Sequence, residues 1–320
     1  MTTDAAAGPG SADRPTDRPT DRPADRPADR PADRPTDRPD ADLTPPPGRE
    51  RVVVTDDGAA LAVTDAGPAG GALAPVVLPH CWTGTRAVWS LVARRLVAAG
   101  HRVVLFDQRG HGASGTGSAG ISVDRLGDDL AAVVSGLDLR DAVVAGHSMG
   151  GMSTMSFACR HPDLVRARVR ALALVATAAH GLAGRGRDRM WRMLLWRDLI
   201  ARVMARPRPG YACVRGTFGA APERAHVDAT RLMFVRTPSA VRRDCMVAMG
   251  EMDLRAALRC VDVTAHVLLG RRDTLIVPRL TRAIIDHIPG ARLTELDGAG
   301  HMLPLERPDE VTATIRRLAG

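Results

Sequence analysis

The chain has 320 residues, of which 45% are hydrophobic and only 3% aromatic, so aliphatic side chains must form most of its core. Its formal net charge is +8, but all 44 basic residues are arginines, interleaved with acidic residues and without any nucleic-acid-binding motif, which argues against nucleic acid as a partner. The five cysteines have no CxxC spacing and no apolar run resembles a signal peptide or a membrane span, so we expect a soluble, cytoplasmic protein without disulfides.

The N-terminal fifty residues differ in composition from the rest of the chain. Residues 13–40 consist of seven copies of the four-residue repeat DRPx. Each copy carries a proline, which interrupts helices and central strands, so we predict a disordered tail at residues 1–49 and one domain at residues 50–320. The repeats are either a replication-slippage tract without a function or a tether or interaction arm.

From Arg51 onward, short β-rich runs alternate with amphipathic helical stretches. An antiparallel pair is expected first, at residues 51–54 and 59–63. Further strands are expected at residues 75–78, 102–106, 141–145, 169–175, 266–269 and 292–296, and helices at residues 88–99, 123–136, 149–161, 278–287 and 308–318. This alternation predicts the α/β class, with a mostly parallel, eight-stranded sheet and helices on both of its faces.

The alternation is interrupted at residues 181–250, where no strand is predicted. Large apolar residues recur there at helical spacing: Met190, Met193, Leu194, Leu199 and Met204. We therefore predict a helical insertion after the strand at residues 169–175, and such an insertion is a candidate lid. Its residues Trp191, Trp196 and Phe218 would either line an apolar acyl site or simply pack the insertion onto the domain.

Ser148 lies at the centre of a G-x-S-x-G motif that runs from Gly146 to Gly150. With 31 glycines in the chain, the motif alone is weak evidence, and Ser148 could be a small residue in a glycine-rich turn. However, an apolar strand precedes the motif and a helical segment follows it, which is the context of a nucleophile elbow. In so tight a turn, side chains at Gly146 and Gly150 would collide with neighbouring backbone.

A serine hydroxyl needs a base to take its proton and a third group to orient that base. His301 and Asp273 each follow a predicted strand, so both are expected in loops at the carboxyl edge of the sheet. Taken singly, Asp273 would be a helix cap or surface charge and His301 a loop residue; together, in the order Ser, Asp, His, they predict a catalytic triad. The expected oxyanion-hole donors are the backbone N–H groups of Met149 and Trp82.

Several segments together resemble the α/β-hydrolase fold superfamily over residues 50–320: His80-Cys81-Trp82, Asp107 to Ser114, Gly146 to Gly151, Gly270 to Asp273 and Gly300-His301. The chain is most similar to lidded serine hydrolases, which include carboxylesterases, cofactor-free haloperoxidases and monoacylglycerol-lipase-like enzymes. The resemblance implies that His80 orients the oxyanion turn, that Arg109 and His111 brace the site, and that no metal or cofactor is required. The family usually has glycine where this chain has Cys81, so the oxyanion hole either tolerates a small thiol or is reshaped by it.

A serine nucleophile with two amide donors predicts hydrolysis of a small to medium apolar ester through an acyl-enzyme. Haloalkane dehalogenases and epoxide hydrolases of the superfamily have aspartate in place of Ser148, and the latter need lid tyrosines, whereas Tyr211 is the single tyrosine here. Two further functions remain open: a perhydrolase or C–C bond hydrolase that uses the same triad, and a non-catalytic ligand-binding protein. The expected partner is a small-molecule ester, and no feature of the sequence predicts an oligomeric state.

Overall fold

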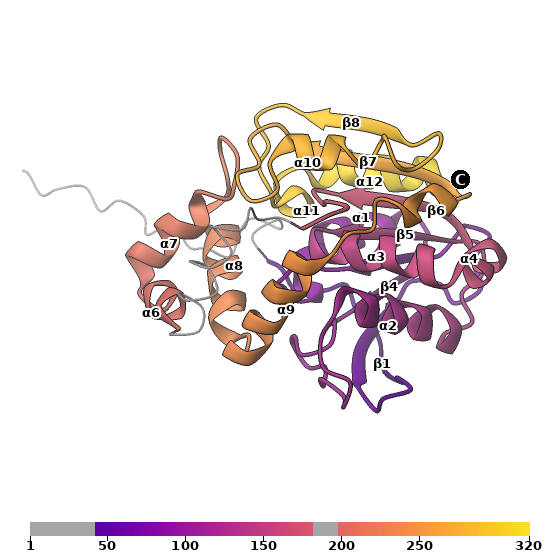
Figure 1. Ribbon diagram of the computed structural model, residues 1–320, viewed down its shortest axis with the longest axis horizontal. Helices are drawn as coiled ribbons and strands as arrows, with labels where there is room; N and C mark the ends of the chain where they lie inside the picture. Colours follow the sequence, from indigo (N-terminus) through magenta and orange to yellow (C-terminus); the bar gives the residue numbers. More distant parts are fainter. Residues whose placement is uncertain (1–41, 182–197) are drawn as a thin grey trace, which may run out of the picture. The chain divides into compact units, whose positions relative to one another are not determined.

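The computed structural model describes residues 42–181 and 198–320 of the chain. Eight strands form one sheet in the order β1-β2-β4-β3-β5-β6-β7-β8 (Figure 1). They are β1 (Gly48–Val54), β2 (Ala60–Ala66), β3 (Val76–Pro79), β4 (Val103–Phe106), β5 (Ala142–His147), β6 (Val169–Val175), β7 (Thr264–Gly270) and β8 (Arg292–Leu296). β2 pairs antiparallel with both β1 and β4, and all other neighbours pair in parallel. The predicted eight-stranded, mostly parallel sheet is therefore confirmed.

Helices cover both faces of the sheet, as predicted (Figure 1). Successive strand residues point to opposite faces, so Val76 and Val77 of β3 belong to different hydrophobic clusters. On the Val76 side the cluster includes residues of α1 (Ser90–Ala98) and α12 (Pro308–Ala319), and on the Val77 side residues of α2 (Val123–Gly136) and α3 (Met149–Arg160). Because both faces are buried, the central strands are uninterrupted apolar runs rather than alternating ones.

The strand order creates a topological switch point at β3. The chain passes from β3 to β4 on one side and then to β5 on the other side. The connections that follow β3 and β5 therefore leave the sheet in opposite directions, and in α/β sheets ligands bind at such a point, at the carboxyl ends of the strands. Trp82 follows β3 and Ser148 follows β5, so the fold brings both to this switch point.

The stretch between β6 and β7 is helical where it is described. It contains α6 (Leu199–Ala205), α7 (Pro207–Arg215), α8 (Arg224–Arg236) and α9 (Ser239–Glu251), then the 3₁₀ turn η2 (Ala257–Cys260). Side chains of the insertion form a hydrophobic cluster with residues of the sheet domain: Met204, Phe218 and Phe234 pack with Cys81, Met302 and Leu305. Of the apolar residues predicted in this stretch, Met190, Trp191, Met193, Leu194 and Trp196 lie outside the described residues.

Some helix boundaries differ from the prediction. The helix predicted at residues 88–99 begins as a 3₁₀ turn, η1 (Arg86–Trp89), before α1, and two short helices, α4 (Pro162–Arg168) and α11 (Leu303–Glu306), were not predicted. The helix predicted at residues 278–287 is regular only as α10 (Pro278–Arg282). Beyond it, Ile285 N and Asp286 N bond three residues back rather than four, so tight turns replace the helix. Ile284 and Ile288 are buried in either conformation, which is why the apolar pattern did not reveal the change.

The first described residues, from residue 42 onward, already contact the sheet domain. Ser90 Oγ of α1 donates a hydrogen bond of 2.7 Å to the carbonyl of Leu43, and β1 begins at Gly48. The DRPx repeats lie outside the described residues. Within residues 42–181 and 198–320, no helix has the length and apolar character needed to cross a membrane.

Candidate active site

Ser148 lies in a sharp turn between β5 and α3. Its φ of 55° and ψ of −116° are unusual for a residue with a side chain, and such backbone strain persists only where the surrounding structure enforces it. Four hydrogen bonds enforce it here: Ser148 N donates to Val175 O at 2.9 Å, and Ser148 O accepts from Thr177 Oγ1 at 2.7 Å, from Gly151 N at 2.8 Å and from Met152 N at 3.1 Å. The hydroxyl is thereby held at the carboxyl edge of the sheet, at the N-terminus of α3.

The glycines of the motif allow three segments of backbone to approach one another closely. A Cβ atom at Gly146 would lie 2.2 Å from Gly150 O, and one at Gly150 would lie 2.2 Å from Pro79 O and 2.8 Å from His80 O. The second contact joins the elbow to the turn that follows β3. The two turns therefore pack directly against each other, and no other residue type fits at either position.

His301 lies within hydrogen-bonding reach of Ser148, and Asp273 lies within hydrogen-bonding reach of the other ring nitrogen of His301. His301 Nε2 is 3.0 Å from Ser148 Oγ, and His301 Nδ1 is 2.7 Å from Asp273 Oδ2. The second carboxylate oxygen of Asp273 accepts from Leu275 N at 2.8 Å and Ile276 N at 2.9 Å, which fixes its orientation. With the Asp273 carboxylate on Nδ1, the imidazole carries its proton there and presents the Nε2 lone pair to the serine hydroxyl.

His147, the residue before Ser148, contacts the backbone of His301. Its Nε2–H donates a hydrogen bond of 2.8 Å to the His301 carbonyl, and the two rings are 5.1 Å apart. Burial and the neighbouring His301 hold the pKa of His147 well below its usual range, so it is neutral. Its Nδ1 has no hydrogen-bond partner among the described residues. Sequence reasoning assigned no role to His147, because the contact joins residues 154 positions apart.

The turn after β3, which carries the expected donor Trp82, is held by the loop after β4. Gln108 N donates to His80 Nε2 at 2.9 Å, and His80 Nδ1–H donates to Cys81 O at 2.8 Å. Thr83 N donates to the His111 ring at 3.2 Å. The expectation that His80 orients this turn is consistent with these contacts, and burial lowers the pKa of His80 to about 3, which keeps Nε2 free to accept.

The other expected donor lies at the start of α3, and the unusual cysteine lies in the turn after β3. Met149 is the first residue of α3, where backbone N–H groups lack a partner within the helix. Cys81 is buried in the cluster with Phe218 and Met302, and burial raises the pKa of its thiol to about 12. At neutral pH the thiol is therefore protonated and acts as a small apolar side chain.

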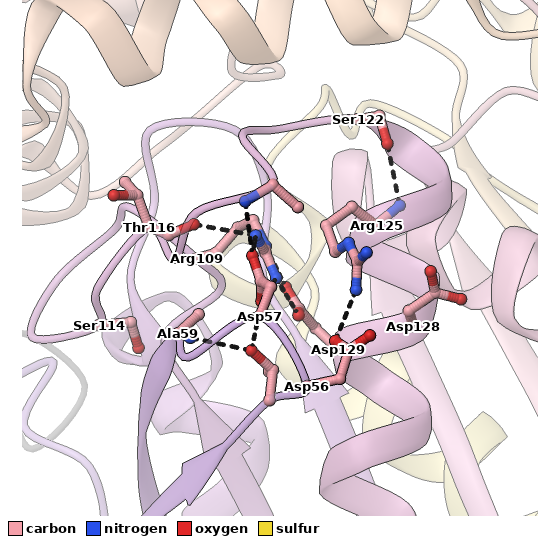
Figure 2. Close-up of polar contacts among 12 residues, drawn as sticks. Asp56, Asp57, Ala59, Arg109, Ser114, Thr116, Ser122, Arg125, Asp128 and Asp129 are labelled. Atoms are coloured by element: carbon pink, nitrogen blue, oxygen red, sulfur yellow. Dashed lines mark hydrogen bonds and ion pairs between the residues drawn. The ribbon is translucent and has the colours of Figure 1, made fainter.

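A buried ion network anchors the loop that supplies Gln108 and His111 (Figure 2). The fully buried Arg109 binds Asp129 through two contacts of 2.6 Å and Asp57 through contacts of 3.0 and 3.1 Å. It also donates to the carbonyls of Thr116 and Gly120, each at 2.9 Å. Hydrogen bonding to Arg109 lowers the pKa of Asp57, whereas burial raises that of Asp129. Arg109 thus ties the loop to the β1–β2 turn and to α2.

The described residues contain no group of three or more His, Cys, Asp or Glu side chains arranged to hold a metal ion. What this arrangement can do chemically is transfer a proton from a hydroxyl to an imidazole next to backbone N–H groups. It suits attack by Ser148 on an electrophilic carbon.

Comparisons with known proteins agree with this architecture. The model of the alpha/beta hydrolase family matches residues 76–314. A non-heme chloroperoxidase of Streptomyces lividans is 28% identical over 266 residues, which cover 80% of this chain and 95% of that protein. A hydrolase from Pseudomonas aeruginosa PA01 is 27% identical with a TM-score of 0.72, covering 85% and 98% of the two chains. The enol-lactonase from Burkholderia xenovorans LB400, at 24% identity, 84% and 99% coverage and a TM-score of 0.72, shares the fold.

Proposed function

Because this chain belongs to the alpha/beta hydrolase family and is a hydrolase, we propose that it cleaves a carboxylic ester through an acyl-enzyme on Ser148. The family hosts several reactions, so the chemistry has to be argued from the site itself. The observation that carries the proposal is the row of buried side chains in which contacts of 2.7 and 3.0 Å join Asp273, His301 and Ser148.

In the first half of the reaction, the Ser148 oxygen attacks the ester carbonyl while His301 Nε2 takes the hydroxyl proton. Asp273 keeps the other ring proton on Nδ1 and stabilises the imidazolium that forms. The carbonyl electron pair moves to its oxygen, for which the N–H groups of Trp82 and Met149 are the proposed donors. When the tetrahedral intermediate collapses, His301 returns the proton to the departing alcohol and the acyl group remains on Ser148.

In the second half, a water molecule replaces the alcohol. His301 takes a proton from the water as its oxygen attacks the acyl carbonyl, and Ser148 leaves with that proton when the acid is released. The same residues thus serve both halves, and no further reactant is consumed.

An apolar acyl group of small to medium size fits the surroundings of the proposed site. Cys81, Phe218 and Met302 belong to one hydrophobic cluster that joins the helical insertion to the oxyanion turn and the His301 loop. The insertion also contacts the site by hydrogen bonds, from Trp82 Nε1 to Arg242 O at 3.1 Å and from His301 N to Thr217 O at 2.9 Å. These contacts support the proposal that the insertion acts as a lid over the substrate.

Perhydrolysis is the second candidate, and the similarity to a non-heme chloroperoxidase favours it over C–C bond hydrolysis. Hydrogen peroxide would then replace water in the second half of the reaction, and attack on the acyl-enzyme would release a peracid. Ester hydrolysis and perhydrolysis share the acyl-enzyme, so the two are separated by assaying acid against peracid formation from one ester in the presence of peroxide.

The proposal is tested with a fluorophosphonate probe and a series of p-nitrophenyl esters of increasing acyl length. The wild-type protein is expected to be labelled once, and Ser148→Ala to fold but lose labelling and nearly all turnover, on the order of a 10⁶-fold decrease in kcat. Ser153→Ala is the control, because Ser153 lies in the same helix and its hydroxyl donates only back to Gly150 O, at 2.9 Å. Labelling that persists in Ser148→Ala would reject the proposal.

A further inference from the structure

The carboxylate of Glu306 binds backbone on both sides of His301 and, at the same time, backbone of the helical insertion. Its Oε2 accepts from Gly300 N at 2.9 Å and from Gly219 N at 2.7 Å, and its Oε1 accepts from Met302 N at 2.9 Å. Gly300 and Met302 flank the proposed base. Gly219 lies in the turn at residues 216–220, which follows α7 in the insertion.

Further contacts join the same turn to the loops of the proposed base and acid. His301 N donates to Thr217 O at 2.9 Å, and Ala220 N donates to Gly298 O at 2.8 Å. Thr274, next to Asp273, donates through its hydroxyl to Gly216 O at 2.9 Å. The turn at residues 216–220 is therefore bonded to both loops.

The backbones at this junction are in close contact. A Cβ atom at Gly300 would lie 2.5 Å from Gly219 N, and one at Gly219 would lie 2.1 Å from Gly298 O. The Cβ at Gly219 would also lie 2.7 Å from the Glu306 carboxylate. Neither segment can move toward the other, and separation would break the hydrogen bond that Glu306 accepts from Gly219 N.

An ionised carboxylate is well suited to this position. It has two acceptor oxygens and no donor, so it can satisfy three N–H groups that converge on it, and hydrogen bonds to a charged acceptor are stronger than neutral ones. A glutamine would offer one oxygen and turn its NH₂ group toward at least one of the three N–H donors. An alanine would leave all three without this acceptor.

We propose that Glu306 is a positioning residue that fastens the His301 loop to the turn at residues 216–220, so that His301 Nε2 stays within reach of Ser148 only while the insertion is seated. This inference rests on the proposed function. Glu306 contacts neither Ser148 nor the His301 ring, and it acts through the backbone of Gly300 and Met302. The base thus depends for its position on a segment that belongs to the insertion.

The first experiment compares Glu306→Ala and Glu306→Gln with the wild-type full-length chain. Because a displacement of about 1 Å at a reacting group can decrease the rate on the order of 100-fold, we expect Glu306→Ala to decrease kcat by about 10- to 100-fold with little change in KM. Glu306→Gln should recover part of this loss. The rate of fluorophosphonate labelling should fall with kcat, since it needs the same base, while the final labelled fraction stays complete.

Glu310→Gln is the matched control. Glu310 lies one turn further along, in the first turn of α12, and its exposed carboxylate is 3.8 Å from the Arg307 guanidinium. Its removal should change kcat by less than about twofold. If the Glu306 variants melt at lower temperature but turn over at the wild-type kcat per active site, with the sites counted by the probe in a parallel sample, then Glu306 is merely structural and the inference is wrong.

A double-variant cycle tests the link to the insertion. Gly219→Ala forces the turn away from Gly298 O and Glu306, so alone it should decrease kcat, whereas in the Glu306→Ala background, where only the contact with Glu306 is already lost, its effect should be smaller. Fully additive effects would show that the insertion and the base are independent, against the inference. A wild-type protein that is neither labelled at Ser148 nor active on esters would instead reject the proposed function, and this inference with it.

Discussion

Ser148 and His301 face each other across 3.0 Å, but the two residues are held in different ways. Around Ser148, backbone packs against backbone: the positions of Gly146 and Gly150 leave no room for even one added carbon atom. This close packing permits only one backbone conformation of the turn, which includes the strained φ of 55° at Ser148. We therefore expect a substitution in this turn either to leave Ser148, the proposed nucleophile, in place or to disrupt the turn completely.

Around His301, backbone is also in close contact at Gly300, but hydrogen bonds from distant parts of the chain hold His301 itself. His147 donates to its carbonyl, its own N–H donates to Thr217 O, and Asp273 accepts from its ring. Each of these contacts can be weakened without steric conflict, and each contributes a modest amount on its own. We therefore expect the loss of one hydrogen bond to displace His301, the proposed base, only partly. One of these hydrogen bonds, to Thr217 O, comes from the helical insertion.

The strongest test of this contrast is Gly146→Ala. The added methyl group would lie 2.2 Å from Gly150 O and 2.4 Å from Thr154 Oγ1, so β5 and α3 must separate, at a cost we expect to exceed about 4 kcal/mol of unfolding free energy. Gly250→Ala in α9 is the control, because its Cβ meets nothing within 4 Å and should stabilise the helix by about 0.5–1 kcal/mol. Urea unfolding measures both, and a Gly146→Ala protein of wild-type stability would remove the steric half of the contrast.

The hydrogen-bonded supports should also make the fold sensitive to mild acid. Burial lowers the pKa of His80 to about 3 and that of His147 well below its usual range, whereas in the unfolded chain both residues have a pKa of about 6.5. Below that pH the unfolded state binds protons that the folded state does not. The free energy of unfolding is therefore highest with respect to these two histidines above about pH 6.5. Below that pH it falls by about 1.4 kcal/mol per pH unit for each histidine.

Urea unfolding at several pH values between 7 and 5 measures this slope. Carboxylates with lowered pKa, such as Asp65 beside Arg102, lose their contribution only nearer the unfolded value of about 3.9, so among the groups with a lowered pKa only the histidines contribute in this interval. Replacing His147 with leucine should make the slope shallower. An unfolding free energy that stays constant from pH 7 to 5 would contradict the prediction.

The parts of the molecule that the sequence predicted well are those with a local signal. Strands such as Val103–Phe106 are short apolar runs, and the turn at Ser148 is marked by its glycines and by the strand and helix on either side. Because the carboxyl ends of parallel strands share one edge, the loops of Asp273 and His301 could be expected near Ser148. The structure brings the three side chains together there, and their catalytic roles remain the proposal that labelling will test.

The parts that the sequence did not predict are set by contacts between distant residues. Gly219 and Glu306 are 87 positions apart, and no local pattern indicates that a carboxylate after His301 binds an N–H of the insertion. The end of α10 was missed for a related reason, since burial of Ile284 and Ile288 is compatible with a helix and with successive tight turns. Patterns of burial predict which residues face the core but not which hydrogen bonds close the loops.

The smallest expected effect comes from His147, and it separates positioning from packing most directly. His147→Leu removes one hydrogen bond, to the His301 carbonyl, and one such bond contributes about 0.5–1.5 kcal/mol, so kcat should fall by about 3- to 10-fold with KM unchanged. His147→Gln keeps an N–H donor and should lose less. Steady-state kinetics on enzyme counted by the fluorophosphonate probe measures both. If His147→Leu instead lowers the unfolding free energy by more than about 4 kcal/mol, as Gly146→Ala is expected to, then the two sides of the site are held by the same kind of constraint and the contrast between them is wrong.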